Sequence, residues 1–278
     1  MKAAFLFCGL TASILAGCAV QPSGPRNAAP ASAGAMSASS ADPTSPLSPA
    51  QKASRRASLE LLQAGRYADL DARMNGFQQA YRARALGDLD LLREFAAFAR
   101  TDSILRANLD AWVTGYPDSY AARLARGIYY FKCGVVTRGK KYIDRTTAAQ
   151  IRGMEVYLTQ ARGDLLKSLP LDAQPLISYH YLLVIGMEFG ERESAREWLD
   201  KGTALDPDSI VIRRPYMISL ETRWGGSLDA MLKFLDASRQ AGASPDHLKM
   251  LDELTDRERR WLHKKPTESA AAESEDPS

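Results

Sequence analysis

A cysteine directly behind a short apolar segment is the residue whose setting points most clearly to a chemical role. The chain opens with Met1 and Lys2, runs apolar to Ala16, and reaches Cys18 through the small residues of "LAGC". A cysteine thiolate is a strong nucleophile, so a reaction at this sulfur is the chemistry to consider. The apolar run is shorter than the about 20 residues that a membrane-spanning helix needs. A positive start, an apolar middle and small residues before a cleavage point together predict a signal peptide over residues 1–17.

The four residues "LAGC" resemble the lipobox of bacterial lipoproteins. This resemblance implies that Cys18 takes a diacylglyceryl group, becomes the first residue after cleavage and holds the protein at a membrane. Ala19 follows the cysteine where Asp would be a retention signal in enteric-type bacteria, which implies the outer membrane, facing the periplasm. The alternative is an ordinary signal peptide with an incidental cysteine.

The segment "GVVTRGKK", residues 134–141, nearly matches the phosphate-binding loop G-x-x-x-x-G-K-[ST]. Lys141 stands where a magnesium-binding hydroxyl is needed, and the segment follows a predicted helix, whereas that loop follows a strand. We therefore expect no nucleotide and interpret Gly134 as a helix C-cap. Arg138, Lys140 and Lys141 would then form a basic loop for lipid headgroups or an acidic partner.

The three histidines are separate from one another and from every cysteine at the spacings that build local sites. His180, His247 and His263 lack a His or Cys three or four residues away, so neither a zinc site nor a Cys–His pair is predicted. Convergence of His180 with a distant Ser and Asp stays open as the basis of a catalytic interpretation. The sequence predicts no metal and no other cofactor.

Other reactive or aromatic residues are interpreted as structural. The acids of "EFGERESAREW" lie at a predicted helix start, where the helix dipole favours them, although paired acids can also do acid–base work. We expect Cys133 to be buried as a small apolar residue. We also expect three aromatic residues to pack in the core, namely Tyr129, Trp198 and Trp224.

The composition separates a folded body from polar ends. The 278 residues carry a net charge of +3, too small a bias to indicate nucleic-acid binding. Residues 18–50 are rich in Ala, Ser and Pro and predict a disordered tether behind the cysteine. Residues 265–278 predict a disordered acidic tail. The body, residues 51–264, has apolar residues at helical spacing throughout, which predicts an all-α domain.

A repeat organises this body. The segments beginning at Ala161 and Ala195 end alike, and the 34 residues between their starts match the tetratricopeptide period. In this alignment, residues of the size typical of the motif stand at its small and bulky positions, namely Leu182, Gly190, Ala195, Leu199 and Gly202. Small residues are needed where paired helices cross closely. The sequence therefore predicts a right-handed α-solenoid of about four tetratricopeptide-like hairpins.

The upstream unit is longer than this period. Counted from Pro117, three residues fall on the glycine, tyrosine and turn-glycine positions of the motif, namely Gly127, Tyr130 and Gly134. The distance from Pro117 to Ala173 exceeds the 34-residue period by 22 residues. We interpret residues 135–156 as an insertion between the two helices of that unit. Gly65 marks a degenerate first hairpin. A last hairpin is expected around Gly225 and Gly226, and Leu248 to Trp261 should form a capping helix.

Three segments, "SYAARLARGIYYFKCGVVTRG", "ARGDL" and "RWGGSLDAMLKFL", carry a more specific resemblance. Together they resemble the tetratricopeptide-like family catalogued as domain of unknown function 4034, from about Ser58 to Ala237. The resemblance implies a helical-repeat fold and no assigned activity.

Tetratricopeptide geometry also predicts a binding surface. In such stacks the second, fifth, ninth and twelfth residues of each first helix line a concave groove, which suits an extended or helical peptide. In this chain the predicted groove residues are Ile128, Phe131, Ile177, His180, Val184, Met187, Arg214, Ile218 and Glu221. The insertion or a neighbouring helix would be an alternative occupant of this groove. We expect a scaffold for an envelope protein or peptide; a cell-envelope hydrolase or a glycan-binding protein remains the alternative.

Overall fold

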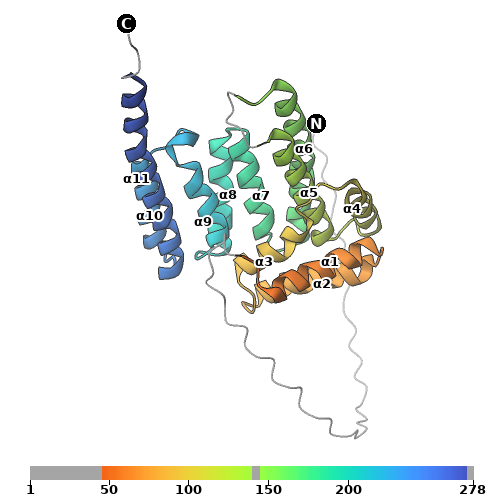
Figure 1. Ribbon diagram of the computed structural model, residues 1–278. Helices are drawn as coiled ribbons and strands as arrows, with labels where there is room; N and C mark the ends of the chain where they lie inside the picture. The colour runs from red at the N-terminus through yellow and green to blue at the C-terminus, as the bar shows by residue number, and fades with distance from the viewer. Residues whose placement is uncertain (1–45, 140–144, 274–278) are drawn as a thin grey trace, which may run out of the picture. The chain divides into compact units, whose positions relative to one another are not determined.

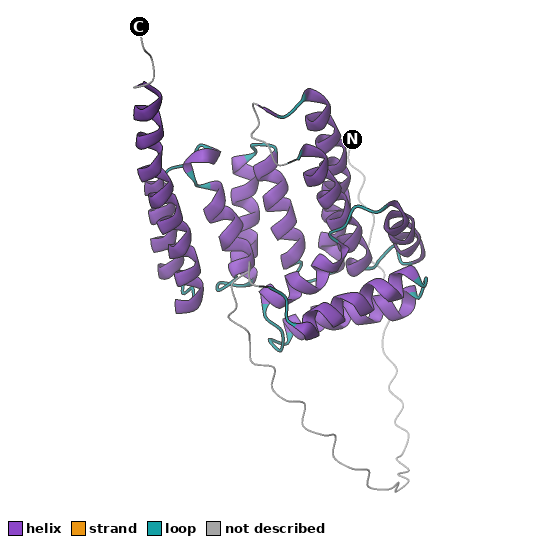
Figure 2. Cartoon of the chain, viewed as in Figure 1, coloured by secondary structure: helices purple, strands orange, loops and turns teal. Residues whose placement is uncertain are grey.

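The computed structural model describes residues 46–139 and 145–273 (Figure 1). In these ranges the chain forms eleven α-helices and short 3-10 turns, and the described part contains no strand (Figure 2). The prediction of an all-α chain is therefore confirmed. Within the same ranges, no helix combines the length and the apolar character that crossing a membrane requires. The predicted signal peptide, Cys18, Lys140 and Lys141 lie outside the described residues.

The first hairpin lies across the later helices. Helix α1 (Pro49–Gln63) begins with a capping box between Ser48 and Gln51. It turns into α2 (Tyr67–Arg82) through Gly65, whose φ of 68° favours glycine. In Figure 1, α1 and α2 run across the direction of α5, α7 and α8. Helix α3 (Asp88–Phe95) and the turn η1 (Ala96–Phe98) follow, and α3 packs against α5, α7 and α9.

The remaining helices follow one another along the body. Helices α5 and α6 pack together, as do α7 with α8, α8 with α9, and α10 with α11. The 3-10 turn η3 follows α6, and the 3-10 turn η4 follows α9. The bounds are α4 Ser103–Gly115, α5 Tyr120–Arg138, α6 Ala148–Ser168, η3 Leu169–Leu171, α7 Leu176–Glu188, α8 Arg192–Leu205, α9 Ile210–Ser219, η4 Thr222–Trp224, α10 Leu228–Gln240 and α11 Pro245–Glu273.

Glycines set the distance between several of these helices. A Cβ atom on Gly127 would lie 3.0 Å from Leu165, and one on Gly202 would lie 2.6 Å from Ile212. Both distances are shorter than ordinary carbon contacts, so a larger residue would push the helices apart. The expectation that the small residues of the repeat mark close crossings is met at both glycines.

The interpretation of Gly134 as a helix cap is wrong. Gly134 lies inside α5 and packs against Leu158 of α6, because close packing between two long helices also selects glycine. Helix α5 instead ends at Arg138, where Gly139 takes a φ of 80°. Residues 135–156, expected as an insertion, contain the end of α5 and the start of α6 and so lengthen this hairpin.

The last helix extends beyond the predicted body. Helix α11 contains the expected capping segment and continues to Glu273, past Lys264, where the folded part was expected to end. Ala and Glu are frequent in this extension, and both are favourable in helices.

Candidate functional site

The predicted groove residues differ in their accessibility. Ile128 and Ile177 are fully buried, and Glu221 is 1% exposed, so these three cannot contact a partner. Their assignment to an accessible groove is wrong, because the surrounding helices enclose Ile128 and Ile177 and the pairing with Arg257 of α11 encloses Glu221. The other six predicted residues keep part of their surface, namely Phe131, His180, Val184, Met187, Arg214 and Ile218.

His180 bonds to the backbone of a neighbouring helix. Its Nδ1 lies 2.8 Å from the carbonyl oxygen of Val211. Because a carbonyl oxygen can only accept, the proton of the ring is on Nδ1 and is donated to Val211. Burial lowers the pKa of His180 to about 4, which keeps the imidazole neutral. The ring also meets Tyr181 edge to face. In the described part of the chain, no carboxylate or hydroxyl bonds to this ring, so the structure gives His180 no nucleophile to activate.

Glu221 is held by two arginines. Its carboxylate pairs with Arg223 and with Arg257 of α11. Glu258 of α11 also accepts a hydrogen bond from the backbone of Thr222. These contacts fix the loop between α9 and α10, so Glu221 has a structural role where the sequence predicted a binding one.

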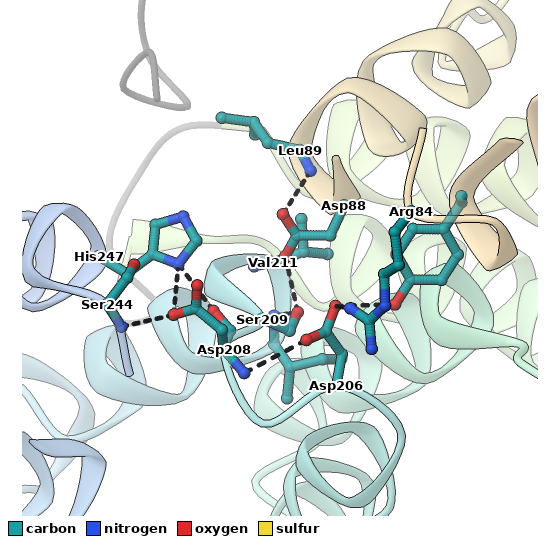
Figure 3. Close-up of polar contacts among 11 residues, drawn as sticks. Arg84, Asp88, Leu89, Asp206, Asp208, Ser209, Val211, Ser244 and His247 are labelled. Carbon is teal, nitrogen blue, oxygen red and sulfur yellow. Dashed lines mark hydrogen bonds and ion pairs between the residues drawn. The ribbon is translucent and has the colours of Figure 1, made fainter. Parts of the chain in front are cut away.

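Asp88 is the centre of a polar junction that joins three distant segments (Figure 3). Its carboxylate accepts hydrogen bonds from Ser209 Oγ at 2.8 Å, from Val211 N at 3.0 Å and from Leu89 N at 2.7 Å. Burial raises the pKa of Asp88, and the bonds from Val211 and Ser209 oppose this rise. These contacts attach the start of α3 to the start of α9.

Two further aspartates extend the same junction. Asp206 accepts from Tyr81 and Arg84, each at 3.1 Å, and so connects to the end of α2. Asp208 accepts from Nδ1 of His247 at 2.9 Å and from the backbone of Ser244 at 2.7 Å, which connects it to α11. We call Asp88, Asp206, Asp208 and their partners the aspartate junction.

The aspartate junction contains the residue types of a hydrolase in a different arrangement. Ser209 donates to Asp88, and its oxygen also caps α9 by accepting from Ile212. His247 instead bonds to Asp208. A Ser–His nucleophile pair needs the hydroxyl to bond to the imidazole. Ser209 and His247 therefore have structural roles, because each connects its segment to an aspartate of the junction. The sequence "LDPDS" indicated only a helix end, because the side chains that bond to its aspartates lie more than 30 residues away.

A small apolar pocket lies where the α7–α8 turn meets the α9–α10 loop. Its volume is about 100 Å³, and Met187, Ala195, Tyr216 and Leu220 supply apolar walls. Trp224 lines it as well and is 38% exposed. We call this the Met187 pocket; it contains one of the predicted groove residues. A pocket with aromatic and aliphatic walls is typical of a site for an apolar group.

The loop that closes the Met187 pocket is fixed by backbone contacts. The Arg192 guanidinium donates to the carbonyl oxygens of Trp224 at 3.0 Å and of Gly225 at 2.9 Å. A Cβ atom on Gly226 would lie 2.1 Å from the carbonyl oxygen of Leu220, so the chain can close here only with glycine. The pocket is therefore built in advance by the fold.

The aromatic residues expected in the core divide into two groups. Tyr129 and Trp198 are buried, and Trp198 stacks on Tyr179 with ring centroids 5.6 Å apart. Trp224 is instead partly exposed beside the Met187 pocket. Trp224 belongs to the 3-10 turn η4, in the loop between α9 and α10.

The other predicted site residues make structural contacts. Arg138 of the basic loop pairs with Glu188 at 3.6 Å, and Arg162 pairs with Glu191 at 2.7 Å. These two acids therefore pair with arginines of the preceding helices α5 and α6. Burial raises the pKa of the Cys133 thiol, which disfavours the reactive thiolate. Among the described residues, no group of His, Cys, Asp and Glu is arranged to hold a metal ion.

Comparison with known proteins identifies the family without identifying an activity. The model of the domain of unknown function DUF4034 matches residues 55–199, more than half of the chain. This match begins near the expected start and ends before Ala237, so it leaves out α9, α10 and the loop of the Met187 pocket. No curated protein and no solved structure matches the sequence. The chain belongs to the DUF4034 family.

Proposed function

We propose that this protein is a lipid-anchored scaffold of the bacterial cell envelope that binds another protein or a peptide. In this proposal Cys18 carries the lipid, the outer membrane holds it, and the helical hairpins form a tetratricopeptide-like solenoid that faces the periplasm. The observation that supports binding is the Met187 pocket, an apolar recess closed by a rigid loop with Trp224 beside it.

The size of the pocket fits one apolar side chain of a partner. Its volume of about 100 Å³ is below the about 150 Å³ of an engineered cavity that binds benzene. An aliphatic side chain is thus the best match. Burying such a side chain contributes about 1.5–3 kcal/mol, which makes it an anchor residue within a larger interface.

Glycan binding is the second candidate, because Trp224 is exposed enough to stack on a sugar ring. The hydrolase alternative needs a nucleophile and a base in contact. His180 bonds to a backbone carbonyl, and Ser209 bonds to Asp88, so neither supports that alternative.

The proposal can be tested by comparing partner capture by matched variants in intact cells. Trp224→Ala removes the exposed ring beside the pocket, and Ile104→Ala removes a side chain that is 71% exposed on α4. We expect a defined partner to crosslink to the wild type and to Ile104→Ala, and to be lost from Trp224→Ala. Equal capture by both variants would refute binding at the Met187 pocket. Capture of no protein, together with retention of envelope glycan that Trp224→Ala abolishes, would favour the glycan alternative.

A further inference from the structure

A second pocket lies between α8, α9 and α10, with a volume of about 400 Å³. Tyr216 and Leu220 line both this pocket and the Met187 pocket, so the two pockets lie next to each other. Arg213 and Ser238 belong to its lining. We call it the Arg213 pocket.

Two donors of this pocket have no partner in the part of the chain that the structure describes. Arg213 is 2% exposed, and its Nη1 makes no hydrogen bond there. Ser238 is also 2% exposed, and its Oγ has no hydrogen-bond partner within the same residues. Buried donors are nearly always satisfied in proteins, so two unsatisfied donors in one pocket point to a group that binds there.

Among the cationic residues that line the pocket, Arg213 is the one whose charge is not balanced by an ion pair with a described residue. Arg196 pairs with Asp200 at 2.9 Å, and Lys233 pairs with Asp229 at 2.8 Å, so both of these cations are already neutralised. Within residues 46–139 and 145–273, no carboxylate forms an ion pair with Arg213. Burial lowers its pKa, and the more distant Asp206 and Asp208 act in the opposite direction.

Those two aspartates do not satisfy the Arg213 guanidinium. Asp206 accepts from Tyr81 and Arg84, and Asp208 accepts from His247. They reduce the positive potential at Arg213 without bonding to it, and Asp200 lies on the pocket wall. A ligand with one negative charge therefore fits better than a doubly charged phosphate, which these carboxylates would repel.

The rest of the lining is largely apolar. Leu199, Tyr216, Leu220 and Phe234 line the pocket, and the rings of Tyr216 and Phe234 lie 5.0 Å apart. A ligand that fills this space needs an apolar body as well as its charged group.

We propose that the Arg213 pocket binds a monocarboxylate with an apolar body. The carboxylate accepts hydrogen bonds from Arg213 and Ser238, and the apolar body packs against Tyr216 and Phe234. Guanidinium groups match the planar geometry of carboxylates, which favours this class of anion. A free acid and the C-terminal carboxylate of a peptide share this chemistry. The site goes beyond the proposed scaffold function and does not depend on it.

The test is isothermal titration calorimetry on the full chain carrying Cys18→Ser, with 4-phenylbutyrate as the probe. We expect binding, and we expect the neutral 4-phenylbutyramide to bind about tenfold more weakly or worse. Inorganic phosphate should not compete. Arg213→Met should abolish binding, Ser238→Ala should weaken it several-fold, and Lys201→Met, on the exposed face of α8, should leave it unchanged.

Several results would overturn the proposal. These are no binding of the acid by the wild type, equal binding of acid and amide, displacement of the acid by phosphate at equal affinity, or full binding by Ser238→Ala. The last result decides even where Arg213→Met fails to fold, because Ser238→Ala removes a single oxygen. Acetyl-Ala-Phe with a free carboxylate distinguishes the sources. If acetyl-Ala-Phe binds more tightly than 4-phenylbutyrate, the natural ligand is the C-terminus of a peptide. If it binds more weakly, the natural ligand is a free acid. Partner capture at Trp224 should be unaffected by Ser238→Ala, which separates this site from the scaffold.

Discussion

Asp88→Ala should weaken the whole fold, because this single carboxylate attaches the N-terminal helices to the start of α9. The substitution leaves Val211 N and Ser209 Oγ without their acceptor, and both residues are buried. Each hydrogen bond to a charged group contributes about 1.5–3 kcal/mol, so the two together account for about 3–6 kcal/mol.

The raised pKa of Asp88 reduces this figure. A raised pKa indicates that burial destabilises the charged carboxylate more than its hydrogen bonds stabilise it. The alanine variant buries no charge, so it avoids this destabilisation. We therefore expect Asp88→Ala to lower the free energy of unfolding by about 2–4 kcal/mol. Asp88→Asn keeps one acceptor oxygen and removes the charge, so it should cost about 1–2 kcal/mol.

Urea unfolding followed by circular dichroism measures these differences. Asp229→Asn is the control, because Asp229 forms an exposed ion pair with Lys233 and its loss should leave stability nearly unchanged. Hydrogen exchange gives a local test, since the Val211 amide should lose protection in Asp88→Ala. A stability within about 0.5 kcal/mol of the wild type and an unchanged Val211 amide would refute the role of the aspartate junction.

Three further predictions concern pH, packing and anchoring. His180 has a pKa of about 4 in the fold against 6.5 in the unfolded chain, so its contribution is present above pH 6.5 and lost as the pH falls to 4. Unfolding measured across this window should show a loss of up to about 3 kcal/mol. His180→Gln should remove this loss and the exposed His263→Gln should retain it; equal slopes would contradict the assignment. Gly202→Ala should destabilise by about 1–3 kcal/mol in urea because the helices must separate. The uncrowded Gly163→Ala should be neutral or stabilising, and a neutral Gly202→Ala would contradict the packing argument. Cys18→Ser should release the protein from the membrane fraction, whereas unchanged retention would show that no lipid is attached there.

Local signals in the sequence predicted the helices and several of their turns. Gly65, Gly190 and Gly225 all take positive φ values at the ends of helices, and each was visible as a break in an apolar pattern. The tight crossing at Gly202 followed from its position in the repeat. These features depend on neighbouring residues, so a single sequence contains them.

Contacts between distant segments could not be predicted in the same way. The burial of Ile128 and Ile177 depends on how neighbouring helices pack against α5 and α7, which no periodic pattern within those two helices encodes. The bond between Asp88 and Ser209 joins residues 121 positions apart. The unsatisfied Arg213 is likewise visible only once every neighbour has a position. The sequence thus indicated the helices, and it missed which side chains of those helices remain exposed.

The most direct test of the scaffold proposal is photo-crosslinking in intact cells from a photoreactive residue at position 224, with the crosslinked peptide mapped by mass spectrometry. The same residue at Glu197, on the exposed face of α8, is the control. We predict that position 224 crosslinks to one apolar segment of one envelope protein and that position 197 does not. Identical crosslinking from both positions, or none from position 224, would contradict binding through the Met187 pocket.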